Sequence, residues 1–394
     1  MVNKYVRKEI ISEYQYYEFL AIDRPLTEGE MAELRMLSTR AEITPVSFTN
    51  VYNWGNFKGD PNILMQYYFD AHVYVANWMT AIFMIRIPIE VLNNKTVKEI
   101  CIPYVLDFKE VTNHWIITWG LDESENIDHF GMEDGSGWMM RLAPIRDELM
   151  RGDLRSLYIG WLAAVSRGII DEEEMEPLSV YGLGNLTSAQ LALAEFLEVD
   201  PDLLTGTGIG SPEDPTKKLS EENIDRWIDA LPRNEIKTLI RQLLEGKGHQ
   251  VERIIRNRFT ATQRALRANK NNPSGRTVKE LRNNAKKAQQ IRMERERRDR
   301  ERLEARLRME REAYLKKLSE DFPKAWRSFA ETVKRGSGLA YDEACQMLVD
   351  ISEAHELFED KQQFQKKLGN FMDSNMRRKA LIKRMAEAGI WKDK

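Results

Sequence analysis

The chain has 394 residues, of which 42% are hydrophobic and 31% charged, and its net charge at neutral pH is −3. This length and apolar content are enough for two or three domains with cores of their own. Two cysteines, Cys101 and Cys345, are too few for a disulfide framework or a cysteine metal cluster, and no apolar run is long enough to span a membrane. We therefore expect a cytoplasmic protein without a signal peptide or a membrane segment.

The small net charge hides a strong asymmetry along the chain. Residues 1–210 hold 16 Lys and Arg against 32 Asp and Glu, a net of −16, so the remaining residues carry +13. Within that second part, residues 231–290 hold 15 basic against 4 acidic side chains, a net of +11. This distribution indicates that the basic middle either docks on the acidic front of the same chain or binds a polyanion.

The front of the chain alternates between strand patterns and helix-start signals. Thr27 with Glu30 has the spacing of a capping box, and Asp60 before Pro61 is an N-cap followed by a first-turn proline. Further helices are predicted at residues 138–150 and 154–167, and a third is capped by Thr187. Residues 1–205 are therefore predicted to form an α+β domain. Its expected strands cover residues 14–22, 41–51, 69–75, 81–87, 100–108 and 113–119.

A glycine- and proline-rich run, TGTGIGSPEDP, predicts a linker at residues 206–218. Its glycines do not have the G-x-G-x-x-G spacing, and no strand precedes them, so a dinucleotide site is not expected. Amphipathic helices with apolar residues at three- and four-residue spacing follow in residues 219–274. On the third of these helices, four arginines form a stripe beside the apolar face, which is suited to contact nucleic acid or a partner protein. They are Arg253, Arg256, Arg264 and Arg267.

A long charged helix is predicted over residues 275–320, opened by a capping box of Thr277 and Glu280. It would form a rod of roughly 65 Å, held by Glu and Arg side chains four residues apart. Its sparse apolar residues favour a solvated helix that packs only at its ends, with a short coiled-coil dimer seam as the alternative. A small helical bundle, predicted as three helices, follows in residues 321–394. The apolar residues of the seam are Leu303, Leu307, Tyr314 and Leu318.

Several phrases, in this order, resemble a family of uncharacterised bacterial proteins over nearly the whole chain. They include YYEFLAIDRPL, WGNFKGDP, GLGNLTSAQLALAEFLEVDPDLL, YDEACQMLVDI and RRKALIKRMAEAGI. The resemblance implies no assigned activity. It does imply, as a partner, a protein with a SWIM-type zinc finger encoded nearby, but the residues of that zinc motif are missing here.

Candidate chemistry centres on Asp70 and His72, which share the polar face of a predicted strand with Tyr74. A carboxylate beside an imidazole could transfer protons, or bind a metal if His114 or His129 supplied a third ligand. The alternative is a structural hydrogen bond on a half-exposed sheet. Because the third ligand depends on the fold, no metal or cofactor is predicted.

A second group of candidates lies in loops that mix aromatic and charged residues, where binding sites concentrate. Internal salt bridges that orient these loops explain the same residues equally well. The group comprises Arg24, Arg40, Trp54, Lys58 and Asp60.

We therefore expect a non-catalytic interaction or scaffold protein that contacts nucleic acid or a nucleic-acid-binding partner through its basic helices. The alternative is an enzyme of unknown reaction with its site on the polar sheet face around Asp70 and His72. The expected fold is an α+β N-terminal domain followed by an all-α region with one long charged helix and a small helical bundle.

Overall fold

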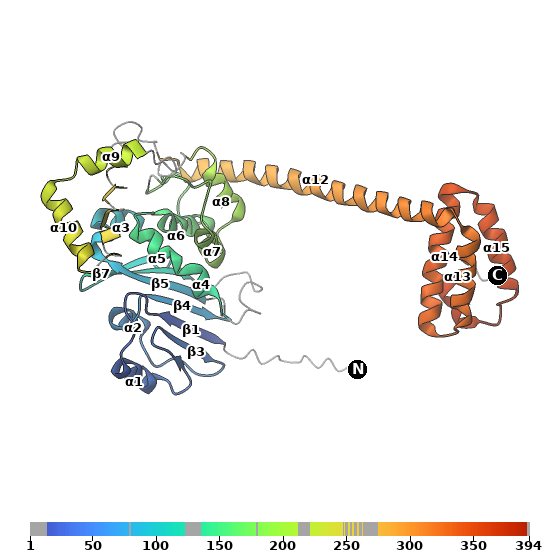
Figure 1. Cartoon of the computed structure of the whole chain (residues 1–394), viewed down its shortest axis with the longest axis horizontal. Coiled ribbons are helices and arrows are strands. Elements are labelled where there is room, and N and C mark those ends of the chain that lie inside the picture. The colour runs from blue at the N-terminus through green and yellow to red at the C-terminus, as the bar shows by residue number, and fades with distance from the viewer. Residues whose placement is uncertain are drawn as a thin grey trace. The chain divides into compact units, whose positions relative to one another are not determined.

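The computed structural model describes residues 14–78, 80–122, 135–178, 180–211, 221–246 and 275–391, together with residues 248, 251–252, 254–255, 258–259 and 262. The chain divides into two compact units, Met1–Gln290 and Ile291–Lys394. The first contains a sheet with helices and the second is helical, so the predicted fold class is confirmed (Figure 1).

The first unit is built on a seven-stranded antiparallel sheet with the order β2-β3-β1-β4-β5-β7-β6. Five of the six predicted strand segments contain strands over most of their length, whereas residues 100–105 do not. Asn93 caps a helix, α3 (Asn94–Ile100), in front of that segment, so the strand there begins only at Leu106. The strands are β1 (Gln15–Leu20), β2 (Glu42–Ile43), β3 (Ser47–Tyr52), β4 (Ala71–Ala76), β5 (Thr80–Pro88), β6 (Leu106–Val111) and β7 (His114–Leu121).

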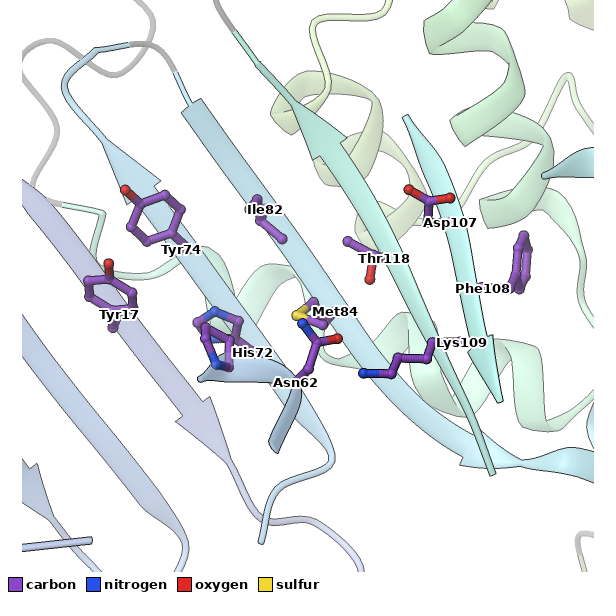
Figure 2. A pocket seen from close by; sticks show the side chains of 11 residues that line it. Tyr17, Asn62, His72, Tyr74, Ile82, Met84, Asp107, Phe108, Lys109 and Thr118 are labelled. Carbon is purple, nitrogen blue, oxygen red and sulfur yellow. The ribbon is translucent and has the colours of Figure 1, made fainter. Parts of the chain in front are cut away.

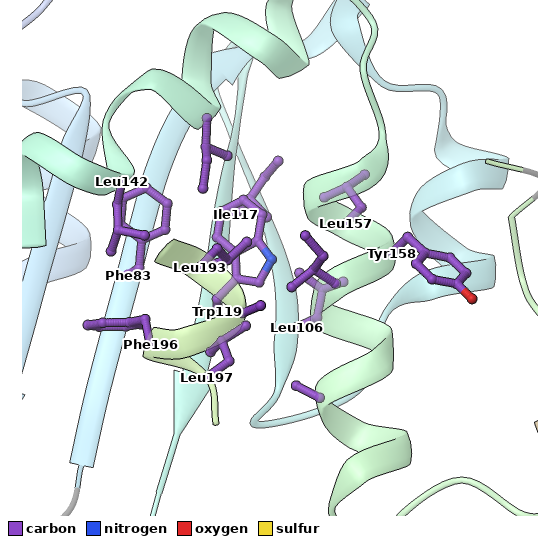
Figure 3. Close-up of a cluster of buried hydrophobic side chains, with 14 of the residues drawn as sticks. Phe83, Leu106, Ile117, Trp119, Leu142, Leu157, Tyr158, Leu193, Phe196 and Leu197 are labelled. Atoms are coloured by element: carbon purple, nitrogen blue, oxygen red, sulfur yellow. The ribbon is translucent and has the colours of Figure 1, made fainter. Parts of the chain in front are cut away.

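One face of the sheet packs on a helical layer and forms the larger core. Phe83 of β5 and Trp119 of β7 stack with ring centroids 5.3 Å apart, and both are fully buried (Figure 3). Trp119 also donates a hydrogen bond from Nε1 to the carbonyl of Ser156, which satisfies its one polar atom. The helices of this layer are α4 (Trp138–Leu142), α5 (Pro144–Met150), α6 (Arg155–Ser166), α7 (Ser188–Phe196) and α8 (Pro201–Gly208).

The opposite face is covered over part of its width by α1 (Glu28–Leu37) and α2 (Pro61–Tyr67). Both helices begin at the predicted caps, Thr27 with its capping box and Asp60. This cover changes the interpretation of the strand at residues 71–76. Asp70 and His72 lie on the predicted polar side, but each is only 1% exposed, because the face is packed rather than half-solvated.

The core of the first unit extends beyond the predicted domain boundary at residue 205. The last turn of α8 occupies the start of the predicted linker and packs on α12 (Val278–Ser319). Gly206 lies so close that a Cβ there would be 2.6 Å from the backbone nitrogen of Ala285. Val278 and Leu281 of α12 are buried in the same core as the sheet. Residues 212–218 of the predicted linker lie outside the described residues.

Two amphipathic helices, α9 (Glu221–Asp229) and α10 (Arg233–Leu244), form where the apolar spacing predicts them. Trp227 of α9 packs edge-on against Phe259, with ring centroids 5.3 Å apart, and its Nε1 donates to the Thr262 hydroxyl. Most of the third predicted helix falls outside the described residues. Where α9 and α10 can be described, the sequence pattern and the structure agree.

The second unit contains the rest of α12 and four further helices. Its core joins Leu315 of α12 to Phe322, Phe329 and Leu348, and Arg311 of α12 pairs with Asp350 at 2.6 Å. The prediction of three tail helices was wrong by one, because the Asp321 cap and the proline after it start an additional helix. The four helices are α13 (Phe322–Lys334), α14 (Gly338–Phe358), α15 (Lys361–Asp373) and α16 (Lys379–Glu387).

Between its packed ends, α12 is exposed and carries local ion pairs. Glu294 binds Arg298 at 2.8 Å, as the four-residue spacing predicts, and also binds Arg297 at 2.9 Å. Leu303 and Leu307 of the predicted seam are exposed. Among the described residues, no helix has the length and apolar character that crossing a membrane requires.

Candidate functional site

A pocket opens on the face of the sheet that α1 and α2 cover only in part. Strand register places Phe19, His72, Met84, Thr118 and Asp107 in one row across β1, β4, β5, β7 and β6. The pocket follows this row from His72 to Asp107 (Figure 2). Its volume is about 540 Å³, within the range of pockets that hold small organic molecules. The site is therefore assembled from five strands, which come from three separate stretches of the sequence.

His72 forms part of the pocket wall in a fixed and uncharged state. Its ring stacks on Phe19 with centroids 3.9 Å apart, and its Nδ1 lies 2.9 Å from the backbone oxygen of Glu18. Because a carbonyl oxygen only accepts hydrogen bonds, Nδ1 carries the proton, and Nε2 is left as an acceptor. Burial lowers the pKa of His72 to about 4, against a smaller opposing effect of the Glu18 hydrogen bond. The imidazole is therefore neutral at cellular pH.

Tyr17 and Tyr74 lie beside His72 and are held by one glutamine. The Tyr17 and Tyr74 hydroxyls donate to Oε1 of Gln15 at 2.7 and 3.4 Å, and Gln15 Nε2 in turn donates to the Gly55 carbonyl at 3.0 Å. Burial is the main cause that raises the pKa of both phenols above the usual value. Both phenols therefore stay protonated, and this end of the pocket is aromatic and uncharged.

The rest of the pocket combines an apolar floor with a polar rim. Ile82 and Met84 form the floor, and Thr118 adds a hydroxyl. Lys109 and Asp107 are exposed side chains at the β6 rim. Further lining residues are Pro61 and Asn62 at the start of α2, and Phe108. Charge is thus confined to the rim, and the floor is neutral.

Asp70 does not act together with His72. Its Oδ2 accepts backbone hydrogen bonds from Ile22 and Asp23 at 2.7 and 2.9 Å, and its Oδ1 pairs with Arg86 at 2.7 Å. Burial raises the pKa of this carboxyl, but the Asp23 hydrogen bond and the charges of Arg86 and Arg146 outweigh it, so the net pKa is lowered. Asp70 therefore holds the turn after β1 in place from a buried position, not on a half-exposed sheet.

The structure does not bring the candidate metal ligands together. His114 is opposite Pro88 at the end of β5, whereas His72 is opposite Met84. Within the described ranges, no group of three or more His, Cys, Asp or Glu side chains is placed to hold a metal ion. His129 lies outside those ranges.

The five candidate residues in loops differ in whether their side chains contact the rest of the fold. Arg24 pairs with Glu30 at 2.6 Å beside the first capping box, and Asp60 caps α2. Trp54 is 65% exposed, and Lys58 and Arg40 are exposed as well. The side chains of Arg24 and Asp60 thus have structural contacts, and Asp60 immediately precedes the pocket residues Pro61 and Asn62.

All four arginines of the predicted stripe, Arg253, Arg256, Arg264 and Arg267, lie outside the described residues. Nine other basic residues of the 231–290 region are described. Three of them are engaged, since Arg258 pairs with Glu235, Arg276 with Glu176, and Arg282 donates to the Val165 carbonyl. The other six are exposed and make no ion pair with a described residue. These exposed cations are Arg233, Lys237, Arg241, Lys279, Lys286 and Lys287.

A second cavity, of about 380 Å³, contains some of the exposed cations. Lys279 and Lys286 line it together with three carboxylates from other parts of the first unit. These are Glu172, Asp200 and Asp202. Lys279 and Lys286 therefore lie near carboxylates that would compete with any bound anion for their positive charges.

Of the residues that line the pocket, the sequence indicated only His72 and Tyr74; the others, among them Met84, Thr118 and Lys109, were not candidates. Residues 81–87 form an apolar run that predicts a strand covered on both sides, and Met84 within it is only 4% exposed although it lines the pocket. A scan against protein-family models and searches of curated proteins and of solved structures found no match for this chain.

Proposed function

We propose that this protein is a non-catalytic interaction protein that contacts the phosphate backbone of nucleic acid through the basic region of residues 231–290. The observation that carries the proposal is that the six exposed cations have no ion-pair partner among the described residues. A cation without a local partner keeps its charge available for phosphate, and each phosphate it neutralises releases counterions.

The arginines on the exposed part of α12 differ from these six cations, because they form ion pairs with glutamates of the same helix. Arg297 pairs with Glu294 at 2.9 Å and with Glu301 at 3.1 Å, and Arg306 pairs with Glu310 at 2.8 Å. These arginines are neutralised by their neighbours on the same helix. The proposed contact therefore depends on the unpaired charge of residues 231–290 and not on basic residues in general.

Binding of this kind is tolerant of sequence and sensitive to salt. The proposed contacts are to phosphates, and phosphate contacts position a protein on nucleic acid without specifying the base sequence. We expect dissociation constants on the order of 10⁻⁴ to 10⁻⁶ M near physiological salt. The acidic front of the chain, with its net of −16, weakens binding by competing for the same cations.

Two charge-matched variants of the full chain test the proposal. One carries Arg233→Ala, Lys237→Ala and Arg241→Ala, and the other carries Arg297→Ala, Arg298→Ala and Arg306→Ala. Both lose three positive charges. Fluorescence anisotropy with a labelled oligonucleotide over a salt series should show that the first variant loses affinity and reduces the salt slope by up to about 3, because each phosphate contact contributes about 0.9. The second should resemble the parent.

Two further variants test the four arginines of the predicted stripe and the carboxylates that share a cavity with Lys279 and Lys286. Replacing Arg253, Arg256, Arg264 and Arg267 by Ala should weaken binding further. Replacing Asp200 and Asp202 by Asn should strengthen binding, because Lys279 and Lys286 share a cavity with them. Equal losses in the two charge-matched variants, or no binding by the parent at low salt, would contradict nucleic-acid contact and favour a protein partner.

A further inference from the structure

We propose that the sheet-face pocket, defined by Tyr17, His72, Tyr74, Met84 and Thr118, binds an uncharged planar small molecule that donates a hydrogen bond to Nε2 of His72. This inference is independent of the proposed contact with nucleic acid. It rests on the shape of the pocket, the fixed orientation of its side chains and the kind of polar atom it offers.

The pocket is formed before a ligand arrives. His72 is fixed on one side by the Glu18 carbonyl and on its face by Phe19. Tyr17 and Tyr74 pack against each other with ring centroids 4.7 Å apart, and Gln15 holds their hydroxyls. Side chains that are already ordered lose little conformational entropy on binding, so the contacts contribute to affinity.

The chemistry of the lining selects the ligand class. Aromatic rings at one end and Met84 with Ile82 on the floor favour a flat, apolar body. Nε2 of the neutral imidazole accepts a hydrogen bond, so the ligand must supply an N–H or O–H donor there. A ligand without a hydrogen-bond donor at this position would leave Nε2 unpaired in a desolvated site, which lowers its affinity.

The same lining disfavours ions. Lys109 and Asp107 are both at the β6 rim, so their opposite charges give no net preference for an anion or a cation. An ionised ligand on the neutral floor would lose its hydration without gaining a buried counter-charge. Primary amides, phenols and neutral heteroaromatic rings that bear an N–H fit these requirements, whereas carboxylates and ammonium groups do not.

A series of three probes with the same ring tests this specificity on the full chain. Benzamide is neutral and donates a hydrogen bond, benzoate is an anion, and benzamidine is a cation. Ligand-observed nuclear magnetic resonance titrations should give benzamide a dissociation constant on the order of 1 mM, as expected for fragments of this size. Benzoate and benzamidine should bind at least about tenfold more weakly, equivalent to about 1.4 kcal/mol.

Two substitutions locate the site. Thr118→Trp extends an indole over the floor and should abolish benzamide binding. Thr49→Trp, on β3 and outside the pocket, is the matched control and should leave it unchanged. His72→Phe keeps the stacking on Phe19 but removes the acceptor. It should weaken benzamide about tenfold while leaving binding of toluene, which has no donor, unaltered.

The proposal is overturned by any of three results: no detectable binding of benzamide at millimolar concentrations, equal binding of the three probes, or equal loss of binding in Thr118→Trp and Thr49→Trp. If Thr118→Trp does not fold, as judged by circular dichroism, the probe series and the His72→Phe comparison still decide the question. Nucleic-acid binding is measured separately and does not depend on these outcomes.

Discussion

Arg276 binds Glu176 across 100 residues of sequence, donating from its backbone nitrogen, Nε and Nη2 to the two carboxylate oxygens at 2.7 to 2.9 Å. Tyr158 donates to the same carboxylate. Arg276 Nη1 also reaches the carbonyls of Thr207 and Ile209, both at 2.9 Å. Arg276, two residues before α12, is thereby attached directly to Glu176 and to the end of α8, and through Glu176 to Tyr158 of α6.

Removing this guanidinium should destabilise the first unit. Arg276→Met leaves the half-buried Glu176 carboxylate with Tyr158 as its one side-chain partner among the described residues, and loss of one partner of a buried pair costs about 3 kcal/mol. Urea unfolding measures the change. Adding Glu176→Leu should restore part of the loss, because the unpaired carboxylate is then gone. Arg306→Met, at an exposed ion pair, is the control and should unfold like the parent.

The contact between α8 and α12 can be tested with two glycines in helices. Gly206→Ala should destabilise the first unit by about 1 to 3 kcal/mol, because its Cβ would be 2.6 Å from the Ala285 nitrogen. Gly29→Ala in α1 meets nothing within 4 Å and should stabilise by up to about 1 kcal/mol. Thermal unfolding of the two variants should shift in opposite directions. A stabilised Gly206→Ala variant would show that the two helices are not in close contact.

His72 should make stability depend on pH. Its pKa is about 4 in the folded protein, below the usual 6.5, so the unfolded chain binds the proton more tightly. The stabilisation is therefore complete above about pH 6.5 and is lost as pH falls toward 4, by up to about 3 kcal/mol. Unfolding free energies at several pH values should show this slope, and His72→Phe should reduce it. An unchanged slope would assign the effect to other groups.

The exposed part of α12 should be helical without either core. Its ion pairs lie within one helix, three or four residues apart, so a peptide of residues 291–310 contains all the partners it needs. Circular dichroism should show helix at low ionic strength and less of it in 1 M salt, which screens exposed pairs. A peptide with its glutamates changed to glutamine should be less helical. Equal helicity of the two peptides would contradict a role for the pairs.

Local features were the ones that the sequence predicted best. The capping boxes of Thr27, Thr187 and Thr277 all form, because each depends only on a residue three positions away. Asn93 and Asp321 are N-caps without a capping box, and the sequence prediction does not include the two helices that they cap.

Contacts between distant residues could not be predicted. The sequence predicts His72 as a candidate but pairs it with Asp70, two residues away, because sequence alone shows only neighbours along the strand. Two residues that share its pocket lie on other strands: Met84 is opposite His72 on β5, and Thr118 is opposite Met84 on β7. Register between strands depends on the whole sheet, so a one-dimensional pattern does not contain it.

The anchored start of α12 has a consequence for how this helix forms. An isolated helix must first fix several residues before any hydrogen bond compensates for the lost entropy, and this nucleus is the unfavourable step. Here the backbone of Val278 and Lys279 already donates to the carbonyls of Glu174 and Glu172, and Thr277 caps the first turn. Folding of the first unit thus supplies the nucleus, and the remaining turns need only propagate. Replacing Glu176, which holds Arg276 just ahead of this start, should therefore slow the formation of a helix that begins at Val278.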